Sequence, residues 1–166
     1  MTADPIPEAI PDPDPAESPT LTPTPTPAPS PVGSVVAVGG GHGLAASLRA
    51  IRSYAASVTG IVSVADDGGS SGRLRKDFPR LPAPGDVRRC LGALAAPGSR
   101  LSETLEHRFG EDDGSLAGHA YGNLLLVALT FGLGSFTAAV EEVGRMTGAV
   151  GRVLPATDVP VQLTGR

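Results

Sequence analysis

Residues 64–75, VADDGGSSGRLR, bring carboxylates, hydroxyls and guanidinium groups together in a stretch with few apolar side chains. The carboxylates of Asp66 and Asp67 suit a ribose diol or a Mg²⁺ ion. The residues that follow offer backbone N–H groups, hydroxyls and a guanidinium group to a phosphate: Gly68, Gly69, Ser70, Ser71, Gly72 and Arg73. The alternative is a solvated turn whose aspartates cap the next helix. The glycines and the paired serines favour an anion site, because such a turn needs neither.

A second glycine-rich cluster, GGGHG, comprises Gly39, Gly40, Gly41, His42 and Gly43. Together with Ala46 it fits G-x-G-x-x-[GA], the turn that lets the backbone approach a diphosphate closely in dinucleotide-binding folds. Asp66 follows 25 positions after Gly41, where such folds carry a ribose-binding acid. Glycine-rich turns between a strand and a helix also occur for packing reasons, so the pattern alone leaves both interpretations open.

Three further polar residues stand beside apolar segments. Asp86 follows the loop LPAPG and is expected either to cap a helix or to contribute to the site. His119 and Asn123 lie in GHAYGN, directly before the most apolar run of the chain. Both residues are candidates for ligand contact at a helix N-terminus, and a structural hydrogen bond is the alternative for the histidine.

The elements that would position these residues alternate between strands and helices. A short buried strand is predicted over residues 34–38, an amphipathic helix over 44–57 and a second strand over 58–65. Two strands joined by a helix are parallel if they share a sheet. Further helices are expected over residues 86–96, 101–109, 123–131 and 136–148. The helix over residues 123–131 is expected to be buried, because it is apolar nearly all round. Strand-like fragments follow from residue 151 onward. The pattern indicates an α/β fold: a Rossmann-like parallel sheet with flanking helices, incomplete at its C-terminus.

Composition divides the chain into residues 1–33, a Pro/Thr-rich acidic tail expected to be disordered, and residues 34–166, the nucleotide-binding part. The net charge is −4, and the first 31 residues supply −5 of it, so the folded part is close to neutral. This balance disfavours a nucleic-acid partner. The chain shows neither a signal peptide nor an apolar run that could span a membrane, so we expect no membrane partner and a cytoplasmic location. The lone Cys90 predicts a small buried hydrophobe.

Five motifs occur in the order found in one bacterial family: VVAVGGGHGL, VADDGGSSGRLR, PAPGDVRRCLGAL, GHAYGNLLLVAL and GRVLPAT. Residues 34–166 therefore resemble the N-terminal portion of the YvcK-like gluconeogenesis factors, which are related to the 2-phospho-L-lactate transferases called CofD. The resemblance implies a Rossmann-like fold that binds UDP-N-acetylglucosamine. It also implies a role in cell shape and in the supply of peptidoglycan precursors on gluconeogenic carbon sources, with glucosamine-6-phosphate synthase as a candidate partner.

The resemblance also carries over individual positions. It implies that residues 39–43, residues 66–72, Asp86 and Asn123 line the ligand pocket. Arg89 stands where the family commonly has asparagine, and family members continue well beyond GRVLPAT.

The leading hypothesis is a UDP-sugar-binding regulator with no chemistry of its own and no required cofactor, because no activated nucleophile is apparent in the sequence. One alternative is a CofD-like transferase in which Asp66 and Asp67 hold Mg²⁺ while a diphosphate donor is cleaved. Another is a protein that binds NAD(P) without catalysis. A homo-oligomer is compatible with all three.

Overall fold

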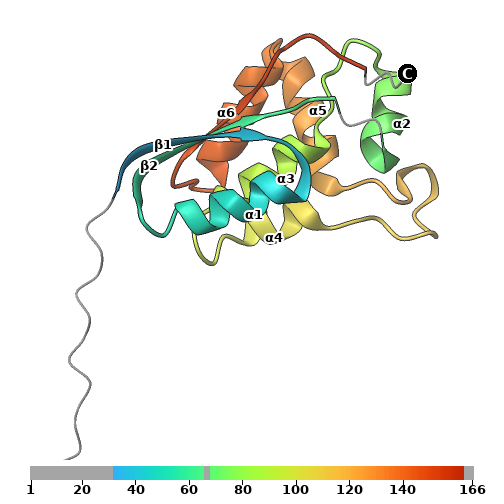
Figure 1. The fold of residues 1–166 in the computed structure, drawn as a ribbon. Helices are drawn as coiled ribbons and strands as arrows, with labels where there is room; N and C mark the ends of the chain where they lie inside the picture. The colour runs from blue at the N-terminus through green and yellow to red at the C-terminus, as the bar shows by residue number, and fades with distance from the viewer. Residues whose placement is uncertain (1–31, 66–67, 163–166) are drawn as a thin grey trace, which may run out of the picture.

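The computed structural model describes residues 32–65 and 68–162, which form an α/β fold (Figure 1). The strands are β1 (Val32–Gly39), β2 (Ala55–Val62) and β3 (Arg152–Pro155). The helices are α1 (Gly41–Ile51), α2 (Gly69–Asp77), α3 (Gly85–Leu94), α4 (Arg100–Glu106), α5 (Tyr121–Leu133) and α6 (Phe136–Met146), with a 3₁₀ turn, η1, at Gly114–Leu116. Residues 1–31 of the expected tail lie outside the described residues, and β1 begins at Val32 rather than Ser34.

The three strands form one parallel sheet in the order β1-β2-β3, which confirms the predicted fold class. The register aligns Val38 with Ile61 and Ile61 with Leu154. Because all strands run in the same direction, their carboxyl ends meet at one edge of the sheet. The glycine turn after β1 therefore begins at this edge, where open α/β sheets bind ligands.

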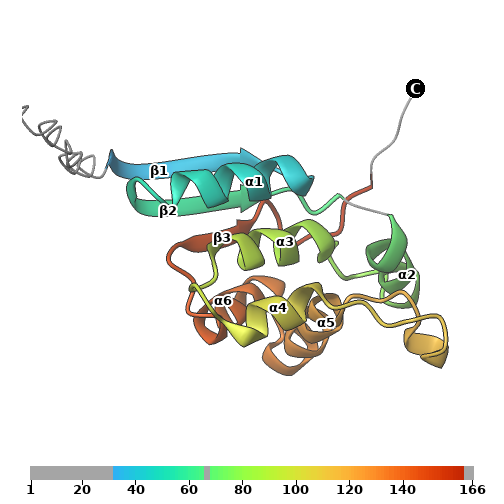
Figure 2. The same ribbon diagram turned by 90° about the horizontal axis from the view of Figure 1, so that it is seen from below.

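Helices α1 and α3 lie against one face of this sheet, as Figures 1 and 2 show from two directions. The α1 residues Leu44 and Leu48 are buried there. Gly60 of β2 lets Leu48 approach the strand, because a Cβ at this position would lie 2.9 Å from the Leu48 Cδ1 atom. On the opposite face Val36 and Val38 are 60% and 74% exposed. Parallel sheets are normally covered on both faces, so the described residues build only one of the two layers.

The most buried helix is α3, which contacts α1, α4, α5, α6 and two strands. Its side chains Val87, Cys90 and Leu94 are fully buried. Burial raises the pKa of the Cys90 thiol to about 12, and the charge of Asp86 adds to this effect. The prediction of a small buried hydrophobe at Cys90 is thus confirmed.

Several expectations about the helices were wrong. The first helix ends at Ile51, and Ala55 starts β2, because pairing with Val32 outweighs the helix propensity of alanine. Residues 69–77 form α2, a helix that was not among the expected elements. Helix α5 is buried on one side only, with Phe131 and Leu133 62% and 51% exposed, although its sequence is apolar nearly all round.

Gly151 is a sensitive position between α6 and β3. A Cβ there would lie 2.6 Å from the carbonyl oxygen of Val58 and 3.2 Å from the Leu94 Cδ1 atom. Gly151→Ala is therefore expected to lower the free energy of unfolding by about 2 kcal/mol through overpacking, measured by urea denaturation of the chain.

Gly132→Ala is the matched control, because nothing lies within 4 Å of that position on α5. It is expected to raise the free energy of unfolding by up to about 1 kcal/mol. Equal urea midpoints for Gly151→Ala and wild type would contradict the close packing of Gly151 against Val58 and Leu94.

Candidate functional site

A polar cavity of about 170 Å³ lies where α2 and α3 begin. It is lined by Gly68, Gly69, Ser70, Ser71, Gly85, Arg88, Arg89, Arg108 and Asn123. The lining thus includes three arginines and residues from the N-terminal ends of two helices. Both features favour a negative charge, and a helix N-terminus also supplies N–H donors to it. The cavity is therefore a candidate site for a phosphate or diphosphate group.

The first turn of helix α2 has features that favour the binding of an anion. Gly69 adopts a positive φ of 47°, which is strained for residues with a side chain, and no acidic residue stands in the first turn. Ser70 and Ser71 are buried at this end. The anion site predicted for this segment stays a prediction, and the helix adds a dipole that a loop would not have.

A buried hydrogen-bond network joins this helix to α5 and α3. The Asn123 Nδ2 atom donates to Ser70 Oγ at 3.0 Å, and Arg88 Nε donates to Asn123 Oδ1 at 3.0 Å. The amide of Ala120 also donates to Ser70 Oγ, at 3.4 Å. Since this oxygen accepts two hydrogen bonds, its own hydrogen is directed to His119 Nδ1, 3.1 Å away. The network fixes the start of α2 against the start of α5.

The hydrogen bond between Ser70 and His119 therefore stabilises the fold, and it does not activate the serine hydroxyl as a nucleophile. Both residues are buried, and the serine oxygen is engaged by two donors. Burial lowers the pKa of His119, and the nearby positive charge of Arg73 lowers it further. A neutral imidazole that accepts from Ser70 agrees with both effects.

Arg88 is the largest fully buried side chain among the described residues. Its Nη1 atom forms an ion pair with Glu106 and donates to the carbonyl oxygen of Leu105 at 3.3 Å. Burial lowers the pKa of Arg88, and the charge of Glu106 opposes this shift. The close packing leaves no room for a side chain at Gly122, where a Cβ would lie 2.8 Å from Arg88 Cδ. Arg88 thus holds α3, α4 and α5 together behind the cavity.

The glycine turn after β1 has a partner within the protein. Gly41 adopts a φ of 64°, and its N–H donates to Asp86 Oδ2 at 2.6 Å. The other carboxylate oxygen, Oδ1, accepts from Arg89 Nη1 at 2.7 Å. Asp86 was expected as a helix cap, but it lies in the first turn of α3, and Pro84 takes the cap position. Its carboxylate is instead shared between α1 and Arg89.

The remaining predicted residues are dispersed. Gly39 and Gly40 are half-buried, and His42 and Gly43 are exposed at the start of α1. Gly72 lines a different cavity, beside Arg75 and Lys76. Arg73 is not among the residues that line the polar cavity, and it donates to the carbonyl oxygen of Ala117 at 2.7 Å. Asp66 and Asp67 lie outside the described residues.

Arg108 is a site residue that the sequence did not indicate. It follows α4 and forms an isolated bridge with Ala120, and its Nη1 atom donates to the carbonyl oxygen of Gly118 at 3.2 Å. No local pattern distinguishes it from other exposed arginines. Only the long-range bridge brings it to the cavity.

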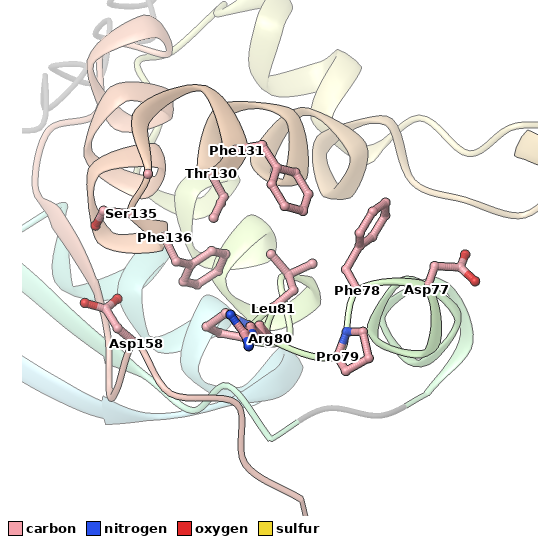
Figure 3. Close-up of a pocket in the computed structure, with 12 residues that line it drawn as sticks. Asp77, Phe78, Pro79, Arg80, Leu81, Thr130, Phe131, Ser135, Phe136 and Asp158 are labelled. Atoms are coloured by element: carbon pink, nitrogen blue, oxygen red, sulfur yellow. The ribbon is translucent and has the colours of Figure 1, made fainter.

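A larger, apolar cavity of about 690 Å³ lies at the other end of α2 (Figure 3). Phe78 and Phe131 meet edge to face there, with ring centroids 5.1 Å apart, and Leu81 and Phe136 line its floor. Arg80 is the one arginine among its lining residues. The cavity lacks the converging donors that a diphosphate needs, so the smaller polar cavity is the better candidate for an anion.

The lowered pKa of His119 predicts a dependence of stability on pH. The folded-state pKa lies below the ordinary value of 6.5, so the unfolded chain binds the proton more readily. The contribution of His119 is complete above the unfolded pKa and is lost as the pH falls from about 7 towards 5. We expect the free energy of unfolding to fall more steeply over this range in wild type than in His119→Gln.

An NMR titration of the imidazole should give a midpoint below 6.5 in the folded protein. A midpoint above this value, with equal slopes for the two proteins, would contradict the buried neutral imidazole.

No helix within residues 32–65 and 68–162 is both long and apolar enough to cross a membrane. The same part of the chain contains no group of three or more His, Cys, Asp or Glu side chains that could hold a metal ion.

Comparison with known proteins identifies close relatives. The chain is 53% identical over 133 residues to the "Putative gluconeogenesis factor" of Mycobacterium leprae, covering 78% of this chain and 36% of that protein. It is 43% identical over 125 residues to the gluconeogenesis factor of Bacillus subtilis, covering 75% and 39%. The crystal structure of protein BH3568 from Bacillus halodurans superimposes with a TM-score of 0.70 at 43% identity, covering 79% of this chain and 41% of that one.

The chain thus spans about two fifths of the length of these relatives. Residues 35–166 match the family described as 2-phospho-L-lactate transferase CofD. This match covers most of the chain, and the structural relative shares the same fold. The protein therefore belongs to the CofD family, and within it resembles the gluconeogenesis factors.

Proposed function

We propose that this protein binds a nucleoside diphosphate sugar, UDP-N-acetylglucosamine, and acts as a regulator rather than as an enzyme. The observation that carries the proposal is the polar cavity, which Arg88, Arg89 and Arg108 line together with the start of α2. Guanidinium groups and backbone N–H groups at a helix start are the donors that bind phosphate groups in proteins. The names of the relatives support a role in carbon metabolism.

The direction of the sheet supports the same site. The cavity lies beside the segment that follows β2, at the carboxyl edge where α/β sheets bind nucleotides. Asp66 and Asp67, which immediately precede Gly68 in the sequence, remain predicted contacts to the ribose or the sugar. In the proposed regulatory role, the bound sugar nucleotide reports the supply of peptidoglycan precursors, and glucosamine-6-phosphate synthase is the proposed protein partner.

The hydrogen bonds that engage the Ser70 hydroxyl support binding without catalysis. Ser70 is the candidate hydroxyl beside a histidine, and the network with Asn123 and His119 occupies it. The family match favours a second candidate, a CofD-like transferase in which Mg²⁺ is held by Asp66 and Asp67. Metal-dependent turnover of a nucleoside diphosphate donor in the presence of a deazaflavin acceptor would favour the transferase.

Titration calorimetry with UDP-N-acetylglucosamine tests the proposal. Arg108→Gln is expected to weaken binding about tenfold, because one charge-assisted hydrogen bond to the diphosphate is lost. Arg108 is exposed, and its side chain donates to the carbonyl oxygen of Gly118 at the surface, so the fold should tolerate the change.

Arg100→Gln is the matched control, because this arginine is exposed at the start of α4 and does not line the cavity. It should bind like wild type. Wild-type protein that gives no heat at millimolar ligand, or an Arg108→Gln variant with unchanged affinity, would contradict the proposal.

A further inference from the structure

The N-terminus of α1 is occupied by a carboxylate of the protein itself. In a dinucleotide-binding fold the diphosphate lies against this glycine turn, where the N–H groups at the start of the helix face it. Here the Gly41 N–H donates to Asp86 Oδ2 at 2.6 Å. The two residues are 45 positions apart, so the contact depends on the packing of α3 against α1.

The glycines of the turn fit this carboxylate closely. A Cβ at Gly40 would lie 3.0 Å from Asp86 Oδ2 and 3.1 Å from Ser63 Cβ. Gly41 needs its positive φ of 64° to present its N–H to the carboxylate. Gly40 and Gly41 of the GGGHG turn are thus explained by an internal carboxylate, and a phosphate at the same N–H would stand beside a second negative charge.

The Asp86 carboxylate also accepts a hydrogen bond from an arginine that lines the polar cavity. Asp86 Oδ1 accepts from Arg89 Nη1 at 2.7 Å, and the two side chains are only 13% and 22% exposed. Arg89 lines the cavity together with Arg88, which is paired with Glu106. Two of the three cavity arginines therefore already have a carboxylate partner among the described residues. Asp86 offsets part of the positive charge that an entering anion would meet.

We propose that Asp86 acts as a built-in anion: it occupies the glycine turn and, through Arg89, limits the anion affinity of the polar cavity. The inference deepens the proposed function and rests on it for the location of the ligand. It assigns Asp86 a role opposite to direct ligand binding. The ligand's phosphate groups are directed to the start of α2, and the start of α1 stays closed to them.

The two roles of Asp86 predict effects of opposite sign. If Asp86 offsets the charge of Arg89, Asp86→Asn should tighten the binding of inorganic pyrophosphate about three- to tenfold, because the Arg89 guanidinium loses its carboxylate partner and becomes available to the anion. If Asp86 binds the ligand or a metal, the same change should weaken binding. Asparagine keeps an oxygen that can accept from Gly41, so the turn retains a hydrogen-bond partner.

The experiment is a set of calorimetric titrations with inorganic pyrophosphate on wild type, Asp86→Asn, Arg89→Gln and the double variant. The gain from Asp86→Asn should disappear in the Arg89→Gln background, since the effect is transmitted by that arginine. Unchanged or weaker binding by Asp86→Asn, an equal gain in both backgrounds, or no pyrophosphate binding to any of the four proteins would overturn the inference.

A measurement on wild type avoids any dependence on variant folding. In a ¹H–¹⁵N NMR titration with pyrophosphate, the amide signals of Ser70 and Ser71 should shift, while that of Gly41 stays in place on Asp86. A shift at Gly41 larger than those at the serines would overturn the inference. If pyrophosphate gives the expected pattern but UDP-N-acetylglucosamine does not bind, the proposed function fails and the role of Asp86 stands.

Discussion

The geometry of the polar cavity depends on the burial of the Arg88 guanidinium group. Removing the charge of Arg88 from water is costly, and burial alone lowers its pKa. The cost is offset only if α4 supplies Glu106 and the carbonyl oxygen of Leu105 while α5 supplies Asn123. These requirements fix three helices relative to one another, and through Asn123 they extend to Ser70 on α2.

This constraint explains why the cavity is polar and small. The walls are the starts of helices, and the helices cannot separate without leaving a buried charge unpaired. The same packing of α3 brings Asp86 to the glycine turn and Arg89 to the cavity. A single helix thus connects the edge of the sheet, the glycine turn and the candidate anion site, so each of these parts is positioned by the most buried element of the fold.

The parts of the structure that follow from local patterns were predictable. The β-branched run before Asp66 and the turn GGGHG indicate two parallel strands and a helix, and the structure has them. Asn123 was correctly placed at the start of a helix. The charge balance of the folded part also agrees with an anion site confined to one cavity rather than a basic face.

The parts that depend on contacts distant in sequence were not predictable. Arg108 reaches the cavity only through its bridge to Ala120, and Asp86 contacts a turn 45 positions earlier. The hydropathy of α5 suggested full burial, but burial depends on how many elements surround a helix, and α3 has more neighbours. The composition of a helix indicates whether its side chains favour burial, whereas the topology of the fold decides how many neighbouring elements cover it.

A crystal structure of the protein with UDP-N-acetylglucosamine tests the central claim most directly. The account predicts electron density for the diphosphate at the start of α2, within hydrogen-bond distance of Arg108 and of the backbone N–H groups of Ser70 and Ser71. Density for the diphosphate against Gly40 and Gly41, with the Asp86 carboxylate displaced, would contradict it.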